Sequence, residues 1–123
     1  MKFMLLSYDN EQAWENAGDA AHKDAIQEAI RLTHRIAAKG QYVACSPLQH
    51  SRTAVCVRMK DGKAVVTDGP YAETHEMIGG FYIVDVPTVE DAVEIAKQHP
   101  GMRYGAVEIR PVVELEGLPP AQL

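Results

Sequence analysis

The order in which extended and helical segments follow one another is the feature that most constrains the fold of this chain. Helical periodicity occurs in two segments, about 20–39 and 88–99, and each lies between runs typical of strands. These extended runs cover residues 2–8, 42–48, 53–59, 63–67, 81–86 and 104–114. The order predicts an α+β fold of the ferredoxin-like β-α-β-β-α-β type with an added hairpin strand. Both helices would then cover one face of an antiparallel sheet.

Short local signals set the limits of these segments. The polar residues 9–18, which include Trp14, are predicted to form a loop. Gly18-Asp19 offers an N-cap for the first helix, and Thr88–Asp91 resembles a capping box for the second. Asp61-Gly62 is a strong hairpin signal between the third and fourth extended runs. The apolar stripe of the first helix, predicted to face inward, consists of Ile26, Ala29, Ile30, Thr33, Ile36 and Ala37.

A second hairpin is predicted with its loop at residues 49–52, which would place Cys45 opposite Cys56. One face of the resulting sheet suits packing under helices and carries Tyr42, Ala44, Leu48, Val55, Val57, Met59, Val107, Ile109 and Val113. The other face is mixed and carries Val43, Cys45, Cys56, Arg58, Tyr104, Glu108 and Arg110. Charges on a mixed face need partners, which favours a dimer interface or a ligand cavity. The two cysteines are either a cross-strand redox pair or two small reduced hydrophobic side chains.

Composition narrows the class of protein. The chain has 123 residues, enough for one domain, and 12 Lys+Arg against 17 Asp+Glu give a formal net charge of −5. That balance argues against nucleic acid or an anionic membrane as the partner. The apolar runs are too short for a membrane span or a signal-peptide core, and two cysteines make no disulfide framework. We therefore expect a cytoplasmic protein with a domain over residues 1–116 and a C-terminal extension at 117–123.

Residues 68–76 (DGPYAETHE), followed by Gly79-Gly80, form the most distinctive stretch of the sequence. A glycine and a proline between Asp68 and Tyr71 would hold these two residues in a rigid turn. A glutamate lies on either side of His75, and such neighbours favour the protonated imidazole. The two adjacent glycines allow the backbone to approach another group closely as the chain enters a strand.

This stretch resembles the DGPF (DGPFAETKE) proteins of the YCII-related family, and the resemblance extends over almost the whole chain. The matching segments are residues 1–8, the loop that reaches Trp14, and residues 61–62, 65–70, 79–82 and 108–111. Tyr71 replaces the phenylalanine of the motif, and His75 replaces its lysine. The resemblance implies a dimeric α/β barrel, in which two ferredoxin-like sheets enclose a shared cavity.

The same resemblance says less about activity. Most such proteins are uncharacterised, and many are encoded near extracytoplasmic-function sigma factors. Some YCII-like relatives resemble small lyases or dehalogenating enzymes built around a His–Asp pair. The corresponding positions of this chain hold Ala29 and His99, so the pair is not carried over.

Two functions from different classes stay open. One is a dimeric small-molecule-binding or accessory protein, which the resemblance links to sigma-factor regulation. The other is a cofactor-independent enzyme with lyase- or isomerase-like acid–base chemistry, acting on a polar organic substrate at the dimer interface. The catalytic candidates are His75 and Asp68, and the ligand-binding candidates are Tyr71, Glu73, Tyr82, Arg58 and Arg110. No cofactor and no metal are expected, because no two histidines have metal-ligand spacing on one element.

Three further histidines have alternative roles. His22 either points into a cavity as an acid–base group or lies at the surface. His50 falls in a predicted loop, where a structural role is the simpler interpretation. His99 ends the second helix, whose dipole would raise the pKa of the imidazole.

Overall fold

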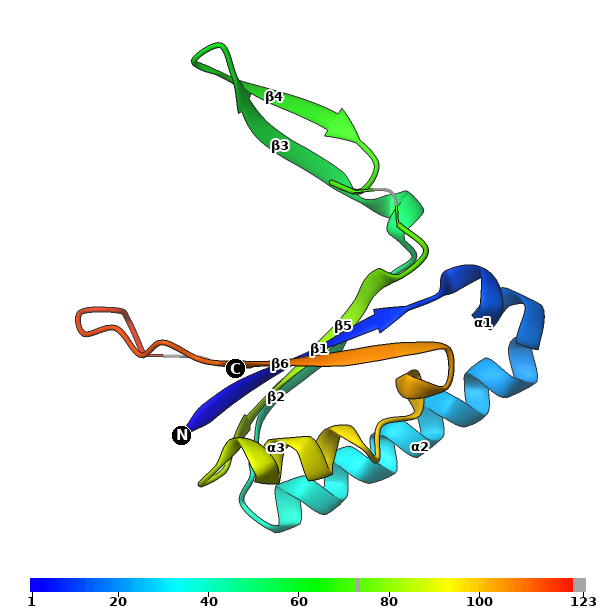
Figure 1. The fold of residues 1–123 in the computed structure, drawn as a ribbon, viewed down its shortest axis with the longest axis vertical. Coiled ribbons are helices and arrows are strands. Elements are labelled where there is room, and N and C mark those ends of the chain that lie inside the picture. The colour runs from blue at the N-terminus through cyan, green and yellow to red at the C-terminus, as the bar shows by residue number, and fades with distance from the viewer. Residues whose placement is uncertain (73, 121–123) are drawn as a thin grey trace.

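A computed structural model describes residues 1–72 and 74–120 of the chain, which form two antiparallel sheets and three α-helices (Figure 1). The strands are β1 (Lys2–Asp9), β2 (Tyr42–Pro47), β3 (Val55–Lys60), β4 (Lys63–Asp68), β5 (Met77–Asp85) and β6 (Gly105–Pro111). The helices are α1 (Glu11–Ala17), α2 (Asp19–Ala38) and α3 (Val89–Ala96), with short 3-10 turns η1 (Ser51–Thr53) and η2 (Pro100–Tyr104). In this part of the chain no helix is both long and apolar enough to cross a membrane.

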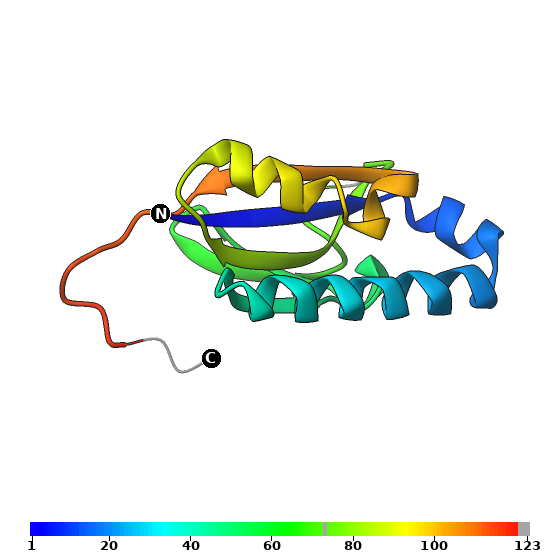
Figure 2. The same cartoon turned by 90° about the horizontal axis from the view of Figure 1, so that it is seen from below.

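The main sheet has the strand order β2-β5-β1-β6, and α2 and α3 lie side by side on one of its faces (Figure 2). Alternate residues of the central strands point toward the helices, as a period of two requires. The core residues are Phe3, Leu5, Leu32, Ile36, Tyr82, Val84, Val86, Ala92, Ile95 and Ala96. Burying one large apolar side chain of this kind contributes about 1.5–3 kcal/mol. The predicted mixed α+β fold is therefore confirmed.

The predicted helix ends are largely confirmed, with one addition. Thr88 and Asp91 form the reciprocal capping box at the start of α3. Helix α2 begins after Gly18, which has a φ of 92° and offers no side-chain cap. The prediction of a loop over residues 9–18 was wrong, because α1 forms there. Asn10 caps this helix by accepting a hydrogen bond from the backbone N–H of Ala13 at 3.0 Å, a local signal typical of helix starts.

The predicted hairpin around residues 49–52 was wrong. Strand β2 pairs with β5, and β3 pairs only with β4 through the Asp61-Gly62 turn, whose φ values are 52° and 76°. Cys45 therefore lies opposite Tyr82 and Cys56 opposite Thr67, and both thiols are free. The β3–β4 hairpin projects away from the main sheet (Figure 1), and we call it the arm.

The arm also overturns part of the predicted helix-packing face. Val55, Val57 and Met59 are 61%, 66% and 69% exposed, because none of the described helices covers the arm. Cys45 was predicted on the mixed face of the sheet, but it packs against the core. A register shift between Tyr42 and Ala44 explains this, since one extra residue reverses which face the following side chains occupy.

The face of the main sheet opposite the helices is partly apolar. The register places Met4 beside Ile83, and Leu6 beside Phe81, and all four side chains are half-buried. Glu108 and Arg110 of β6 lie opposite Leu6 and Met4 and form an ion pair at 3.7 Å. Tyr104, predicted at the start of the last strand, lies in η2 instead. We call this surface the open face.

Candidate functional site

A cavity of about 400 Å³ lies between α2, the end of β2 with residues 48–50 that follow it, the end of β1 and the first half of β5. Its apolar wall comes from α2, where Ile26 and Ile30 are 48% and 45% exposed. The stripe of α2 that was predicted to face inward is only partly confirmed. Ile36 is buried together with Leu32, which was not part of the predicted stripe, whereas Ala37 is exposed. The polar side chains that line the cavity are Ser7, Asp9, Glu11, Glu15, Asp19, His22, Thr33, Ser46, Gln49, His50, Tyr82 and His99.

Asp9 brings a half-buried carboxylate into this cavity at the end of β1. Burial raises the pKa of Asp9 above its ordinary value, and a hydrogen bond donated by Ser7 Oγ to Oδ1 at 3.4 Å partly opposes that shift. The nearby charge of Glu11 raises it further, and the electrostatic influence of His22 lowers it. A carboxyl group with a raised pKa in a cavity can hold and release a proton near a bound molecule.

The position of Asp9 depends on Gly79. The β1–β5 register shifts between Ser7 and Tyr8, so that Gly79 forms a bulge opposite this point. A Cβ atom built on Gly79 would lie 1.8 Å from Asp9 Oδ2. The sequence predicted that the two glycines allow a close approach, and the group that approaches Gly79 is this carboxylate. Its neighbour Gly80 is close to the backbone oxygen of Ser46.

Tyr82 and His99 form the inner end of the cavity. The Tyr82 hydroxyl lies 2.8 Å from Thr33 Oγ1, which itself donates to the Ala29 carbonyl at 2.8 Å. Tyr82 can then donate to Thr33, and burial raises the pKa of the phenol. The rings of Tyr82 and His99 meet edge to face at 5.5 Å. Tyr82 is thus the predicted ligand-binding residue that the structure places in this cavity.

His99 corrects the expectation drawn from the helix dipole. Burial lowers the pKa of His99, which outweighs the opposite influence of Glu28. Helix α3 ends at Ala96, so His99 instead precedes η2, where its Nδ1 accepts the Gly101 N–H at 3.1 Å. An acceptor at Nδ1 leaves the proton of a neutral imidazole on Nε2. His99 therefore contributes a neutral imidazole to the cavity wall.

The outer end of the cavity is aromatic and acidic. His22 lines the mouth of the cavity and is exposed. Its ring lies 5.8 Å from that of Trp14, which in turn packs edge-on against Tyr104 at 4.8 Å. Trp14 belongs to α1, between Glu11 and Glu15, so the helix that the sequence did not predict supplies this end of the cavity.

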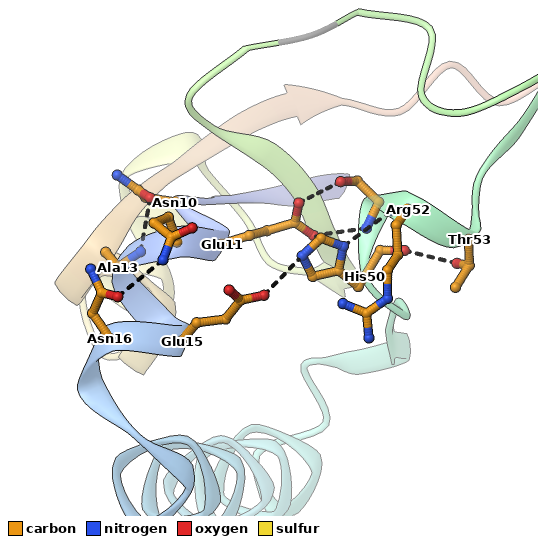
Figure 3. Close-up of polar contacts among 10 residues, drawn as sticks. Asn10, Glu11, Ala13, Glu15, Asn16, His50, Arg52 and Thr53 are labelled. Carbon is orange, nitrogen blue, oxygen red and sulfur yellow. Dashed lines mark hydrogen bonds and ion pairs between the residues drawn. The ribbon is translucent and has the colours of Figure 1, made fainter.

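A polar cluster fixes α1 to the turn η1 across the mouth (Figure 3). Glu11 accepts from the backbone N–H of Ser51 at 2.8 Å and from the Ser51 hydroxyl. His50 Nε2 lies 3.3 Å from Glu15, while His50 Nδ1 accepts the Arg52 N–H at 3.0 Å. The Glu11 carboxylate and one His50 proton therefore hold α1 and η1 together at the mouth of the cavity.

The residues predicted from the 68–76 motif lie elsewhere. Asp68 and His75 are exposed, and among the described residues neither lines the cavity nor forms an ion pair with the other. Arg58 lies over the Tyr71 ring, with Cζ 5.1 Å from its centroid. Glu73 falls outside the described residues. Arg110 is on the open face, paired with Glu108. Of the predicted site residues that the structure describes, only Arg58 and Tyr71 lie together within one copy.

Comparison with known proteins places this arrangement in a family. The profile of the YCII-related domain matches residues 1–116. The chain belongs to the YCII-related family. An uncharacterised protein of Rhizobium meliloti (strain 1021) is 26% identical over 117 residues, covering 91% of this chain and 92% of the relative.

A solved structure shares the fold of this YCII-related chain. It is the 5-chloro-2-hydroxyhydroquinone dehydrochlorinase of Burkholderia phenoliruptrix AC1100 in complex with 2,5-dihydroxybenzoquinone. The TM-score is 0.50 with 12% sequence identity, and the match covers 94% of this chain and 97% of that one. At this identity the likeness concerns the fold alone.

Proposed function

We propose that this chain is a homodimeric protein that binds a small polar organic molecule in the cavity between α2 and the sheet. The observation that carries this proposal is the cavity itself. Its volume of about 400 Å³ is within the range of small-molecule sites. Aliphatic and aromatic walls alternate with polar groups, among them Asp9, His99 and Tyr82, and apolar walls with polar groups are the usual composition of such sites. An accessory role beside a sigma factor, drawn from the DGPF resemblance, is one setting for such binding.

Two surfaces support a homodimer. The open face carries Met4, Leu6, Phe81 and Ile83 without a helix over it, as both helices lie on the other side (Figure 2). The arm exposes Val57, Met59 and Val66 on one face, and a two-stranded hairpin is marginally stable by itself in water. A second copy of the ferredoxin-like unit would cover both surfaces and complete an α/β barrel. His75 and Asp68 would then take part in catalysis only if the dimer places them at the cavity of the second copy.

The binding proposal is tested by a thermal-shift screen of small phenols, amines and carboxylates. We expect at least one compound to raise the midpoint of unfolding, because a ligand that binds only the folded state stabilises it. Ala29→Leu places a larger side chain into the cavity wall and should abolish that shift. Ala37→Leu, on the exposed side of the same helix, is the matched control and should keep it. A shift that survives Ala29→Leu, or a screen without any stabilising compound, contradicts the proposal.

An acid–base enzyme is the second candidate, and the placement of Asp9 favours it. The carboxylate has a raised pKa, lies in the cavity and senses the charge of His22. Such a group can take a proton from a bound carbon or oxygen acid without a cofactor. The test is deuterium exchange into a compound that the screen identifies, followed by NMR. Exchange that the protein accelerates and Asp9→Asn abolishes would support catalysis, and exchange at the solvent rate would leave binding alone.

A further inference from the structure

We propose that the cavity selects its ligand by charge, binding a ring-sized protonated amine more tightly than its neutral analogue and excluding carboxylates. This inference rests on the proposed function, because it specifies the ligand of the same cavity. Its basis is the set of charged groups that line the cavity, all within the described residues. They include four carboxylates and no lysine or arginine.

The basic residues near the cavity do not balance these carboxylates. On α2, Lys23, Arg31 and Arg35 are exposed and are absent from the lining. Arg52, beside His50 at the mouth, is also exposed and absent from the lining, and Arg103 of η2 pairs with Glu28 outside it. Of the three imidazoles of the lining, His22 at the mouth is the one whose charge opposes that of Asp9, and the other two offer little compensation. Burial lowers the pKa of His99, and His50 already uses both ring nitrogens within the cluster at the mouth. An anionic ligand would therefore be repelled by the negatively charged side chains that line the cavity.

The four carboxylates differ in how far the protein satisfies them. Glu11 accepts two hydrogen bonds from Ser51, and Glu15 lies beside His50 Nε2. Asp9 has only the long 3.4 Å bond from Ser7, although it is half-buried. A half-buried carboxylate with unfilled acceptor capacity gains most from a charge-assisted donor. An ammonium group is such a donor, so Asp9 is the group expected to recognise it.

The aromatic end of the cavity suits the same ligand. Trp14 lines the mouth between Glu11 and Glu15 on one face of α1. The face of an indole ring attracts cations, and neighbouring carboxylates add to that attraction. A molecule with one ring and one ammonium group can thus place its ring against Ile26 and Ile30 while its charge approaches Asp9. The apolar wall and the carboxylate come from facing elements, α2 and β1.

The test uses three matched probes, benzylamine, benzyl alcohol and benzoate, titrated at pH 7 and fixed ionic strength. Trp14 is the only tryptophan in the chain, so its fluorescence reports occupancy of the cavity. We expect benzylamine to bind about tenfold more tightly than benzyl alcohol, and benzoate to be weaker still. Equal affinities, or benzoate binding best, would overturn the charge selection while leaving the binding proposal standing. If none of the probes binds and the broader screen also fails, the proposed function falls with it.

Two substitutions locate the effect. Asp9→Asn removes the charge but keeps the shape, and should bring the affinities for benzylamine and benzyl alcohol within about twofold of each other. Asp61→Asn, in the turn of the arm, removes the same charge far from the cavity and should leave the tenfold ratio unchanged. Should Asp9→Asn fail to fold, Asp19→Asn at the mouth gives a second reading, with a smaller loss of the ratio. A ratio unaffected in both cavity variants contradicts the inference.

Discussion

Asp9 and Gly79 occupy one space: the carboxylate of the first lies where a side chain of the second would be, with Oδ2 1.8 Å from a Cβ placed on residue 79. A side chain on residue 79 would therefore require the Asp9 carboxylate to move. The Cβ atom of Asp9 lies 3.5 Å from the Cβ placed on residue 79, which is an ordinary contact. Only the carboxyl group would therefore clash. The glycine thus makes room for the charged group of the cavity.

Gly79→Ala should therefore destabilise the fold by about 1–3 kcal/mol, the usual range for overpacking, and displace the Asp9 carboxylate. Asp9→Ala in the same chain removes the conflicting atoms. The double variant should then recover much of the loss, with a coupling of about 0.5–3 kcal/mol in urea unfolding. Simple additivity of the two single changes would show that the close approach is not what constrains residue 79.

The raised pKa of Asp9 predicts how the stability of the fold changes with pH. Its ordinary value is 3.8, and burial raises the pKa in the folded state, so folding favours the protonated form. This contribution to stability is complete below pH 3.8 and is lost as the pH rises through the folded-state pKa. Asp9→Asn should consequently be more stable than the parent chain at pH 7, with a difference that shrinks toward pH 4. Thermal midpoints across this range, with Asp61→Asn as control, measure the effect; a difference independent of pH contradicts it.

His99 predicts the opposite dependence. Burial lowers the pKa of its imidazole from 6.5, so the folded state favours the neutral form. The stability that this provides is present above pH 6.5 and declines as the pH falls through the folded-state pKa. His99→Asn retains an acceptor for the Gly101 N–H and should reduce the loss of stability between pH 7 and pH 5. The exposed His34→Asn on α2 is the control, and an equal effect of both variants would exclude a special role for His99.

The sequence predicts the local elements of this fold well, because their signals are local. The capping box at Thr88 and the Asp61-Gly62 turn each depend on a few neighbouring residues. Strand partners are different, since β2 could pair with β3 next to it or with β5, more than thirty residues away. Only the three-dimensional packing decides between them. The register shift near Tyr42 then moved Cys45 to the core side.

The candidate site was harder to predict for a related reason. Asp9, Gly79 and His99 lie far apart in the sequence, and pairing of β1 with β5 brings the first two together. The Gly79-Gly80 pair was the available signal, but it indicates a close approach without naming the group that approaches. The 68–76 motif is distinctive in the sequence because its residues are contiguous, yet in one copy none of its described residues lines the cavity.

The arm gives a direct prediction about the homodimer. Pairing of Val57 with Val66 and of Met59 with Ala64 places these side chains on one face of the hairpin, where Val57 and Val66 are 66% and 65% exposed. If a second copy covers this face, Val57→Asp should shift the protein from dimer to monomer in analytical ultracentrifugation, because a buried charge lacks a partner there. Thr67→Asp places the same charge on the opposite face and should leave the dimer intact. A dimer that tolerates Val57→Asp would mean that the open face alone forms the interface. A monomeric parent chain would remove the dimer from the proposal and leave each cavity to act by itself.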